Sequence, residues 1–147
     1  MNVALGADHA GFQLKDALKR VLDELGIAYH DFGTSSPESV DYPDLAEVVA
    51  RGVAAHKFDR GILVCGSGIG MSIAANKIAG VRAAVVSDVE AAKLSRQHND
   101  ANVVAIGARL TPAERAADIV RVFLLTDFAG GRHSGRVEKI ARLENAH

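Results

Sequence analysis

The sequence predicts an α/β fold in which a parallel sheet of about five strands is covered by helices on both faces. Short apolar runs alternate with segments of helical spacing about five times along the chain. Residues 61–65 form a continuous apolar run, as expected of a strand that is buried on both faces. The 147 residues, 48% of them apolar, can form one sizeable core, so we expect a single domain over residues 1–147.

The first half of the chain predicts two strands and two helices. Residues 2–7 form a short apolar run that stops at Asp8 and His9. A helical pattern follows up to residue 25, and Gly26 stands where a left-handed cap is expected. The positions that carry this pattern are Leu14, Ala17, Leu18, Val21, Leu22 and Leu25. A second strand over residues 27–32 leads into a loop rich in turn residues, and residues 45–55 are typical of a helix.

The second half predicts three strands, each followed by a helix. The strands are expected within residues 60–66, 79–88 and 101–108. Ser87 and Glu90 have the spacing of a capping box for the helix after the fourth strand. Thr111 and Pro112 have the residue types of an N-cap and a first helical position for the helix after the fifth.

Polar residues gather where the predicted strands end. Ligands of doubly wound sheets bind beyond the carboxyl ends of the strands. We therefore expect one edge of the sheet to carry Asp8, His9, Cys65 with the glycines after it, Ser87, Asp88 and Gly107 to Arg109.

Composition argues against several classes of function. A net charge of −1 gives no excess of positive charge for nucleic acid or for an anionic membrane surface. One cysteine makes no intramolecular disulfide, and no apolar run approaches the ~20 residues that span a bilayer. The N-terminus lacks the basic start and long apolar core of a signal peptide, so we expect a soluble cytoplasmic protein.

The loop after residue 65 is rich in glycine and reads Gly66, Ser67, Gly68, Ile69, Gly70. Such a loop lets the backbone approach a ligand closely, and the helix after it directs free N–H groups towards an anion. The spacing matches no P-loop and fits the dinucleotide-binding fingerprint only loosely. We favour an anion-binding loop over a tight turn without a ligand.

Cys65 has two interpretations. A lone buried cysteine is usually a small hydrophobic residue. A thiol that faces backbone N–H groups at a helix N-terminus is instead expected to ionise near neutral pH, and a thiolate can act as a base or a nucleophile. The residues alone leave both interpretations open.

Asp8, His9 and His98 are candidates for proton transfer. Asp8 could simply cap the first helix and His98 simply end the fourth. If they share an edge with a thiolate, they form the acid–base set that proton transfer requires. Their spacing matches no metal-ligand pattern, so we expect no metal.

Basic residues form a further group: Arg109 after the fifth strand, then Arg132 and Arg136 on one helix face. A solvated, charged helix face is the simpler explanation. Guanidinium pairs also bind phosphate well, and Gly130 and Gly131 would let this helix leave the domain and reach a partner.

Five segments together resemble, in order and spacing, the type B ribose-5-phosphate isomerases, whose family includes the galactose-6-phosphate isomerase subunits. The resemblance covers nearly the whole chain. The segments are GADHAGFQLK, DYPD, ILVCGSGIGMSIAANK, LSRQHNDANVVAIGAR and GGRHSGRVEKI.

The resemblance implies a Rossmann-like three-layer sandwich and a homodimer with active sites at the subunit interface. The C-terminal helix would reach the partner subunit, and pairing of dimers into tetramers stays open. The implied reaction interconverts D-ribose 5-phosphate and D-ribulose 5-phosphate without a metal or cofactor.

The resemblance also implies roles for individual residues. Cys65 would move the proton between C1 and C2, and His98, assisted by Asp8, would open the sugar ring. Residues 66–70 would stabilise the enediolate, with Ser67 relaying protons between its two oxygens. The remaining implied contacts are His9, Arg109, Arg132 and Arg136 to the phosphate, and Tyr42 and Asn99 to the sugar.

Two other functions remain compatible with the residues. The first is isomerisation of a hexose 6-phosphate such as allose or galactose 6-phosphate, because Ser67, Ile69 and the stretch near Tyr42 could shape a longer pocket. The second is a non-catalytic phosphosugar-binding module that keeps the phosphate contacts.

Overall fold

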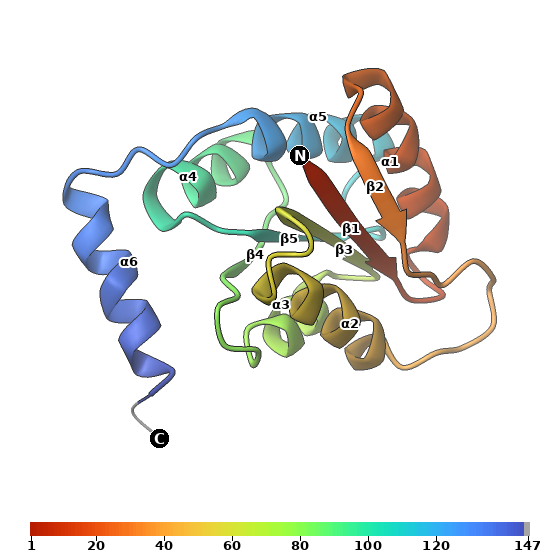
Figure 1. Ribbon diagram of the computed structural model, residues 1–147. Helices are drawn as coiled ribbons and strands as arrows, with labels where there is room; N and C mark the ends of the chain where they lie inside the picture. Colours follow the sequence, from red (N-terminus) through yellow and green to blue (C-terminus); the bar gives the residue numbers. More distant parts are fainter. Residues whose placement is uncertain (146–147) are drawn as a thin grey trace.

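The computed structural model describes residues 1–145 and confirms the predicted fold class. Five parallel strands form one sheet in the order β2-β1-β3-β5-β4 (Figure 1). The strands are β1 (Asn2–Ala7), β2 (Ala28–Asp31), β3 (Arg60–Cys65), β4 (Ala83–Val85) and β5 (Val103–Gly107). The helices are α1 (Phe12–Leu25), α2 (Tyr42–Ala54), α3 (Ile69–Ala75), α4 (Val89–Asn99), α5 (Ala113–Leu125) and α6 (Arg132–Leu143).

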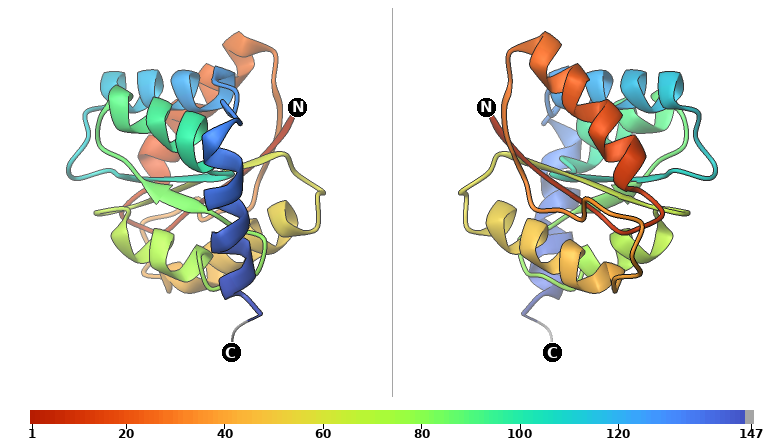
Figure 2. Two further views of the ribbon diagram at one scale, coloured as in Figure 1. Left: turned by 90° about the vertical axis from the view of Figure 1, so that its left-hand side faces the viewer. Right: turned by 90° about the vertical axis from the view of Figure 1, so that its right-hand side faces the viewer.

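The sheet separates two apolar cores, because successive side chains of a strand point to opposite faces. Ile62 and Val64 of β3 pack in the core beneath α1, α4 and α5. Leu63 and Cys65 pack in the core beneath α2 and α3. Figure 2 shows the resulting three layers. Cys65 therefore lies on the α2/α3 face, at the end of the central strand.

Helix boundaries follow the sequence signals with three corrections. Helix α2 begins at Tyr42, three residues before its predicted start at residue 45. Gly26 ends α1 in the left-handed region, at φ 67°, as predicted. Asp88, and not Ser87, caps α4, since its carboxylate accepts the Ala91 N–H at 2.7 Å. No side chain caps α5, and the hydroxyl of Thr111 is buried without a hydrogen-bond partner. The start of a helix can shift by one residue because several polar residues there compete to cap it.

Strand β4 lies at one edge of the sheet and is only three residues long. The Asn76 side chain pairs with this edge as a neighbouring strand would. Its amide nitrogen donates to Ala83 O at 2.9 Å, and its amide oxygen accepts Ala83 N at 2.7 Å. A side chain of the same subunit thus satisfies backbone groups that the edge would otherwise expose.

Helix α6 stands apart from the three layers (Figure 1). Gly130 and Gly131 precede it at positive φ, and the helix packs against α4 without burying any of its own residues. A groove of about 710 Å³ lies between α6 and the β4 edge, and Ile140 and Leu143 line its α6 side. None of the described helices has the length and apolarity that crossing a membrane requires.

Candidate active site

The carboxyl edge of the sheet brings one group of the predicted residues together. Asp8 and His9 follow β1, Cys65 ends β3 and Arg109 comes shortly after β5. Because β1 and β5 flank β3, these residues lie at neighbouring strand ends. We call this group, with residues 66–70 and Tyr42, the thiol edge.

The glycine-rich loop folds back over the Cys65 sulfur. Cys65 is 5% exposed, and its Sγ accepts a hydrogen bond from the Gly68 N–H at 3.1 Å. Gly68 has φ 78°, and a Cβ atom there would lie 2.9 Å from the backbone carbon of Ile106. The positive φ and the close approach of the loop to the end of β5 therefore require glycine at this position.

Side chains on either side of this turn define its surroundings. The Ser67 hydroxyl oxygen accepts the Ile69 N–H at 3.2 Å, so the hydroxyl stays beside the loop. The Tyr42 ring packs on Gly70, where a Cβ atom would lie 2.5 Å from Tyr42 Cε1. Tyr42 is 40% exposed, which leaves part of its ring open at the site.

Asp8 and His9 are both held by backbone groups. Asp8 is 7% exposed, and its Oδ1 accepts the N–H groups of Ala10 and Gly11 at 2.9 and 3.1 Å. This carboxylate closes the turn that leads into α1, but it is not the helix cap, because the N-cap is Gly11 and no side chain caps α1. His9 Nδ1 accepts the Val40 N–H at 3.2 Å, which leaves Nε2 as the nitrogen that can donate to a ligand.

Arg109 approaches the same loop from β5. Its backbone N–H donates to Gly66 O at 3.0 Å. Its guanidinium lies over Gly66, because a Cβ atom on that glycine would be 3.4 Å from Arg109 Cζ. The side chain is exposed and thus free to meet an anion above the loop.

A buried ion pair supports the thiol edge from behind, and sequence reasoning missed it. Lys15 is fully buried, and its Nζ lies 2.5 Å from Asp31 Oδ2. Asp31 Oδ1 accepts the Gly33 N–H at 2.8 Å, and Gly33 O accepts the Ala7 N–H at 2.7 Å. Burial alone would raise the pKa of Asp31, but hydrogen bonds from Lys15, Lys19 and Gly33 lower it below its ordinary value. The ion pair thereby fixes the loop at Gly33 against Ala7, the residue before Asp8.

The structure corrects the expected place of His98. We expected His98 on the same edge as Cys65, but it lies at the end of α4. Helix α4 follows β4 and returns the chain to the start of β5. His98 and Asn99 therefore lie at the amino edge of the sheet, opposite the thiol edge of the same chain.

The N-terminus of α6 meets His98 at this second place. The rings of His98 and His133 stack with centroids 4.3 Å apart and an interplanar angle of 15°. Arg132 and Arg136 flank His133 on α6 and are exposed. We call His98, Asn99, Arg132, His133 and Arg136 the histidine arm.

His133 had no role in the sequence analysis, and its environment is unusual for a histidine. Partial burial lowers the pKa of His133, and the nearby His98, Arg132 and Arg136 lower it further. The ring thus favours the neutral form more than a free histidine does. The residues around His133 come from α4 and α6, and the sequence pattern does not predict that these two helices meet.

Within residues 1–145, no group of three or more His, Cys, Asp or Glu residues is arranged to hold a metal ion. A pocket of about 200 Å³ lies beside the glycine-rich loop, and Ser67, Ile69 and Thr111 contribute to its lining. The 710 Å³ groove includes Asn99 of the histidine arm and no residue of the thiol edge.

Comparison with known proteins gives a consistent result. The family model described as Ribose/Galactose Isomerase matches residues 3–140. Ribose-5-phosphate isomerase B of Escherichia coli is 50% identical over 142 residues, which are 97% of this chain and 95% of that protein. The putative sugar phosphate isomerase YwlF of Bacillus subtilis is 46% identical, with coverage of 98% and 97%. The structure of Clostridium thermocellum ribose-5-phosphate isomerase B superposes with a TM-score of 0.97 at 46% identity and 99% coverage of both chains.

Proposed function

Because the chain belongs to the ribose/galactose isomerase family, we propose that it interconverts D-ribose 5-phosphate and D-ribulose 5-phosphate. The observation that carries the proposal is the contact between Cys65 Sγ and the Gly68 N–H at 3.1 Å. An N–H donated to sulfur stabilises the thiolate, which is the form of cysteine that can remove a carbon-bound proton.

The chemical step is a proton transfer between neighbouring carbons. The Cys65 thiolate removes the proton from C2 of the open-chain aldose, and the electron pair of that bond forms the enediolate. The resulting thiol then returns the proton to C1, while the Ser67 hydroxyl moves a proton from O2 to O1. N–H groups of residues 66–70 stabilise the negative charge on the enediolate oxygens, and electrostatic stabilisation of this kind usually contributes most to such catalysis.

The substrate must first lose its ring form. His98 removes the proton from the C1 hydroxyl as the C1–O4 bond breaks, and the imidazolium returns that proton to O4. Asp8 assists this step. The reaction as a whole has no net redox change, so we propose that it needs neither a metal nor a cofactor.

Two copies of the chain are needed to bring His98 to Cys65. Within one chain they lie at opposite edges of the sheet. We therefore propose a homodimer in which the histidine arm of each copy meets the thiol edge of the other. The unburied α6, with Ile140 and Leu143 exposed, supports this arrangement, because those side chains gain cover only from another surface.

The phosphate group would lie between the two copies. His9 Nε2 and Arg109 face it from one copy, and Arg132 and Arg136 from the other. Guanidinium groups suit bidentate contacts with phosphate oxygens. Tyr42 and Asn99 line the sugar between the phosphate and Cys65. Phosphate binding far from the reacting carbons orients them for the proton transfer.

The proposal includes a cytoplasmic location. The substrate is a charged sugar phosphate, and a membrane retains such molecules in the compartment where they are made.

The deciding experiment measures ribulose 5-phosphate formation from ribose 5-phosphate, in EDTA, for the native protein and for Cys65→Ala. We expect native turnover, and a loss in kcat of roughly 10²- to 10⁴-fold in the variant because its base is missing. Cys65→Ser is the matched control, since it keeps a hydrogen-bond acceptor of similar size but lacks the thiol. Substrate binding, followed by calorimetry, should survive both changes.

Other results would redirect the proposal. Full activity of Cys65→Ala would contradict the base assignment. A higher kcat/KM for allose or galactose 6-phosphate would make the protein a hexose phosphate isomerase. Tight binding with no product from any sugar phosphate would indicate a non-catalytic module.

A further inference from the structure

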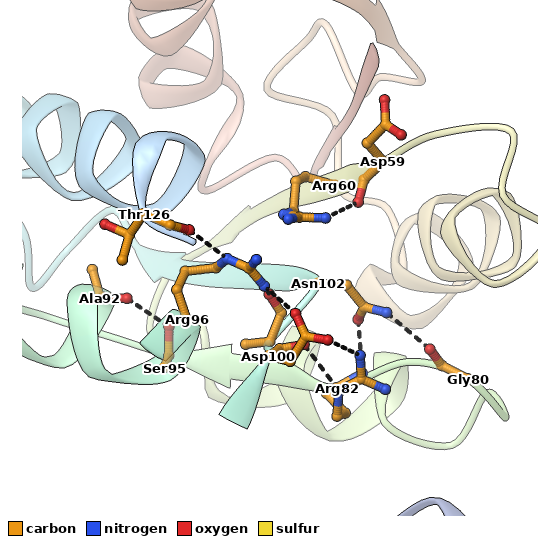
Figure 3. Close-up of polar contacts among 11 residues, drawn as sticks. Asp59, Arg60, Gly80, Arg82, Ala92, Ser95, Arg96, Asp100, Asn102 and Thr126 are labelled. Atoms are coloured by element: carbon orange, nitrogen blue, oxygen red, sulfur yellow. Dashed lines mark hydrogen bonds and ion pairs between the residues drawn. The ribbon is translucent and has the colours of Figure 1, made fainter. Parts of the chain in front are cut away.

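The buried Arg96 side chain joins the end of α4 to the end of α5 (Figure 3). Arg96 is 2% exposed. Its Nη1 donates to Asp100 Oδ1 at 2.8 Å and to Ala101 O at 2.6 Å. Its Nε donates to Thr126 O at 3.1 Å, just after α5. One guanidinium thus holds both segments in a fixed relative position.

Asp100 fixes the last turn of α4. It ends the helix in a left-handed conformation at φ 47°, which aspartate tolerates better than most residues other than glycine. Arg96 holds the carboxylate from one side. From the other side, Arg82 Nε donates to Asp100 O at 2.9 Å, and Arg82 Nη2 lies 3.5 Å from Asp100 Oδ2. Figure 3 shows Asp100 between the two guanidinium groups.

The two segments that Arg96 joins carry the stacked histidines. His98 lies between Arg96 and Asp100 in the last turn of α4. The other segment runs from Thr126 into α6 and is tied to α4 again where the Ala129 N–H donates to Gln97 O at 3.1 Å. His133 follows on the first turn of α6 and stacks on His98. The stack therefore depends on the position of both segments.

We propose that Arg96, acting through Asp100 and Thr126, is a positioning residue that holds His98 in place for opening of the sugar ring. The inference rests on the proposed isomerase function. It separates the ring-opening step, which depends on Arg96, from proton transfer at Cys65, which does not.

Two substrates distinguish the two steps. Ribose 5-phosphate is mostly cyclic and must be opened before Cys65 can act. Ribulose 5-phosphate is acyclic, because its C5 oxygen carries the phosphate and no hydroxyl remains at a position that closes a stable ring. Exchange of its C1 proton in D2O at saturating substrate, followed by NMR, therefore reports on proton transfer at Cys65 without the ring-opening step.

The test compares these two rates in Arg96→Gln. We expect kcat/KM for ribose 5-phosphate to fall by roughly 10- to 100-fold, since small displacements of a catalytic group have effects of that size. The exchange rate of ribulose 5-phosphate should stay within about a factor of three. His98→Asn should show the same split, because it removes the group that Arg96 positions.

Further variants separate positioning from charge and from folding. Arg96→Lys keeps the charge but not the planar fork, so it should show the same split as Arg96→Gln. Asp100→Asn is the milder variant if the Arg96 variants do not fold, because asparagine tolerates the left-handed conformation. In Asp100→Asn, kcat/KM for ribose 5-phosphate should again fall more than the exchange rate of ribulose 5-phosphate, but by less than in Arg96→Gln. Arg121→Gln is the matched control, since Arg121 pairs with Asp118 and Glu24 on the surface, and it should change neither rate.

The outcomes are separable. If the native protein shows neither turnover nor exchange, the proposed function fails and the inference with it. If the native protein is active and the folded Arg96 or Asp100 variants lose both rates equally, or neither, Arg96 is a structural residue only and the inference is overturned.

Discussion

The thiol edge and the histidine arm are built in different ways. Cys65 and Asp8 are nearly buried, and backbone groups of the same chain hold both. By contrast, no residue of α6 is buried, and Arg132 and Arg136 extend from it into solvent. A single chain completes the thiol edge when it folds. The histidine arm of the same chain lies away from that edge.

This difference explains why the candidate catalytic residues do not meet within one subunit. Side chains at the carboxyl edge are brought together by the strand order itself. Side chains at the end of a returning helix lie at the other edge, and in the proposed dimer a second molecule brings them to the site. The proposed dimer is thus part of the chemistry.

The largest expected effect comes from mixing two inactive variants. Cys65→Ala lacks the base and His98→Asn lacks the ring-opening group, so each alone should be nearly inactive on ribose 5-phosphate. If the arm of one copy serves the thiol edge of the other, a mixed dimer has one site with both native groups. Random pairing after co-refolding should therefore restore about a quarter of the native activity.

A control mixture of Cys65→Ala with Cys65→Ser should stay inactive, because neither copy supplies a base. Absence of recovery in the first mixture, with mixed dimers shown by two affinity tags, would mean that the two regions do not serve each other.

A second prediction compares how firmly the two regions are folded. Lys15→Met removes the buried partner of Asp31 but leaves the contacts of Asp31 with Lys19 and the Gly33 N–H, so the free energy of unfolding should fall by about 1 to 3 kcal/mol. Arg142→Met in α6 breaks an exposed ion pair with Glu138 at 3.9 Å. This change should leave the free energy of unfolding the same within error. Chemical denaturation of both variants measures the difference. Similar losses in the two would remove the contrast between a buried and an exposed region.

The smallest effect concerns the ionisation of His133. Its lowered pKa means that the unfolded chain takes up this proton at a higher pH than the folded protein does. The stability that neutral His133 contributes is therefore present above its ordinary pKa and is lost as the pH falls below that value. An NMR titration of the His133 ring follows the ionisation directly. His98→Asn and Arg136→Gln each remove a like charge and should raise the pKa of His133; an unchanged titration would show that burial alone sets it.

Much of the fold could be predicted because its signals are local. The alternation of strand and helix patterns follows from side-chain burial along each element, and Gly26 marks the end of α1. The caps of α4 and α5 were harder to predict, because Ser87, Asp88, Thr111 and Pro112 all suit a helix start and geometry decides among them.

The candidate site was only partly predictable. Residues at the ends of strands or directly after them, such as Cys65 and Asp8, were placed correctly by sheet topology. His98 was misplaced because its helix returns to the opposite edge, and its stacking on His133 joins two helices that the sequence keeps far apart. Lys15 does carry a local signal. It falls on the apolar face of α1, one turn from Leu18, where a charged residue needs a buried partner.

The pairing of Asn76 with Ala83 has a consequence for how copies of the protein can associate. An unprotected edge strand invites a strand from another molecule, and repeated addition of strands leads to aggregates. Here the outward-facing backbone groups of Ala83 are already bonded within the subunit, and β4 has only two further residues. A strand from another molecule cannot pair at Ala83, so we expect association on this side of the molecule to rely mainly on side chains. Contacts of that kind select a specific partner surface, whereas a bare strand edge pairs with almost any other.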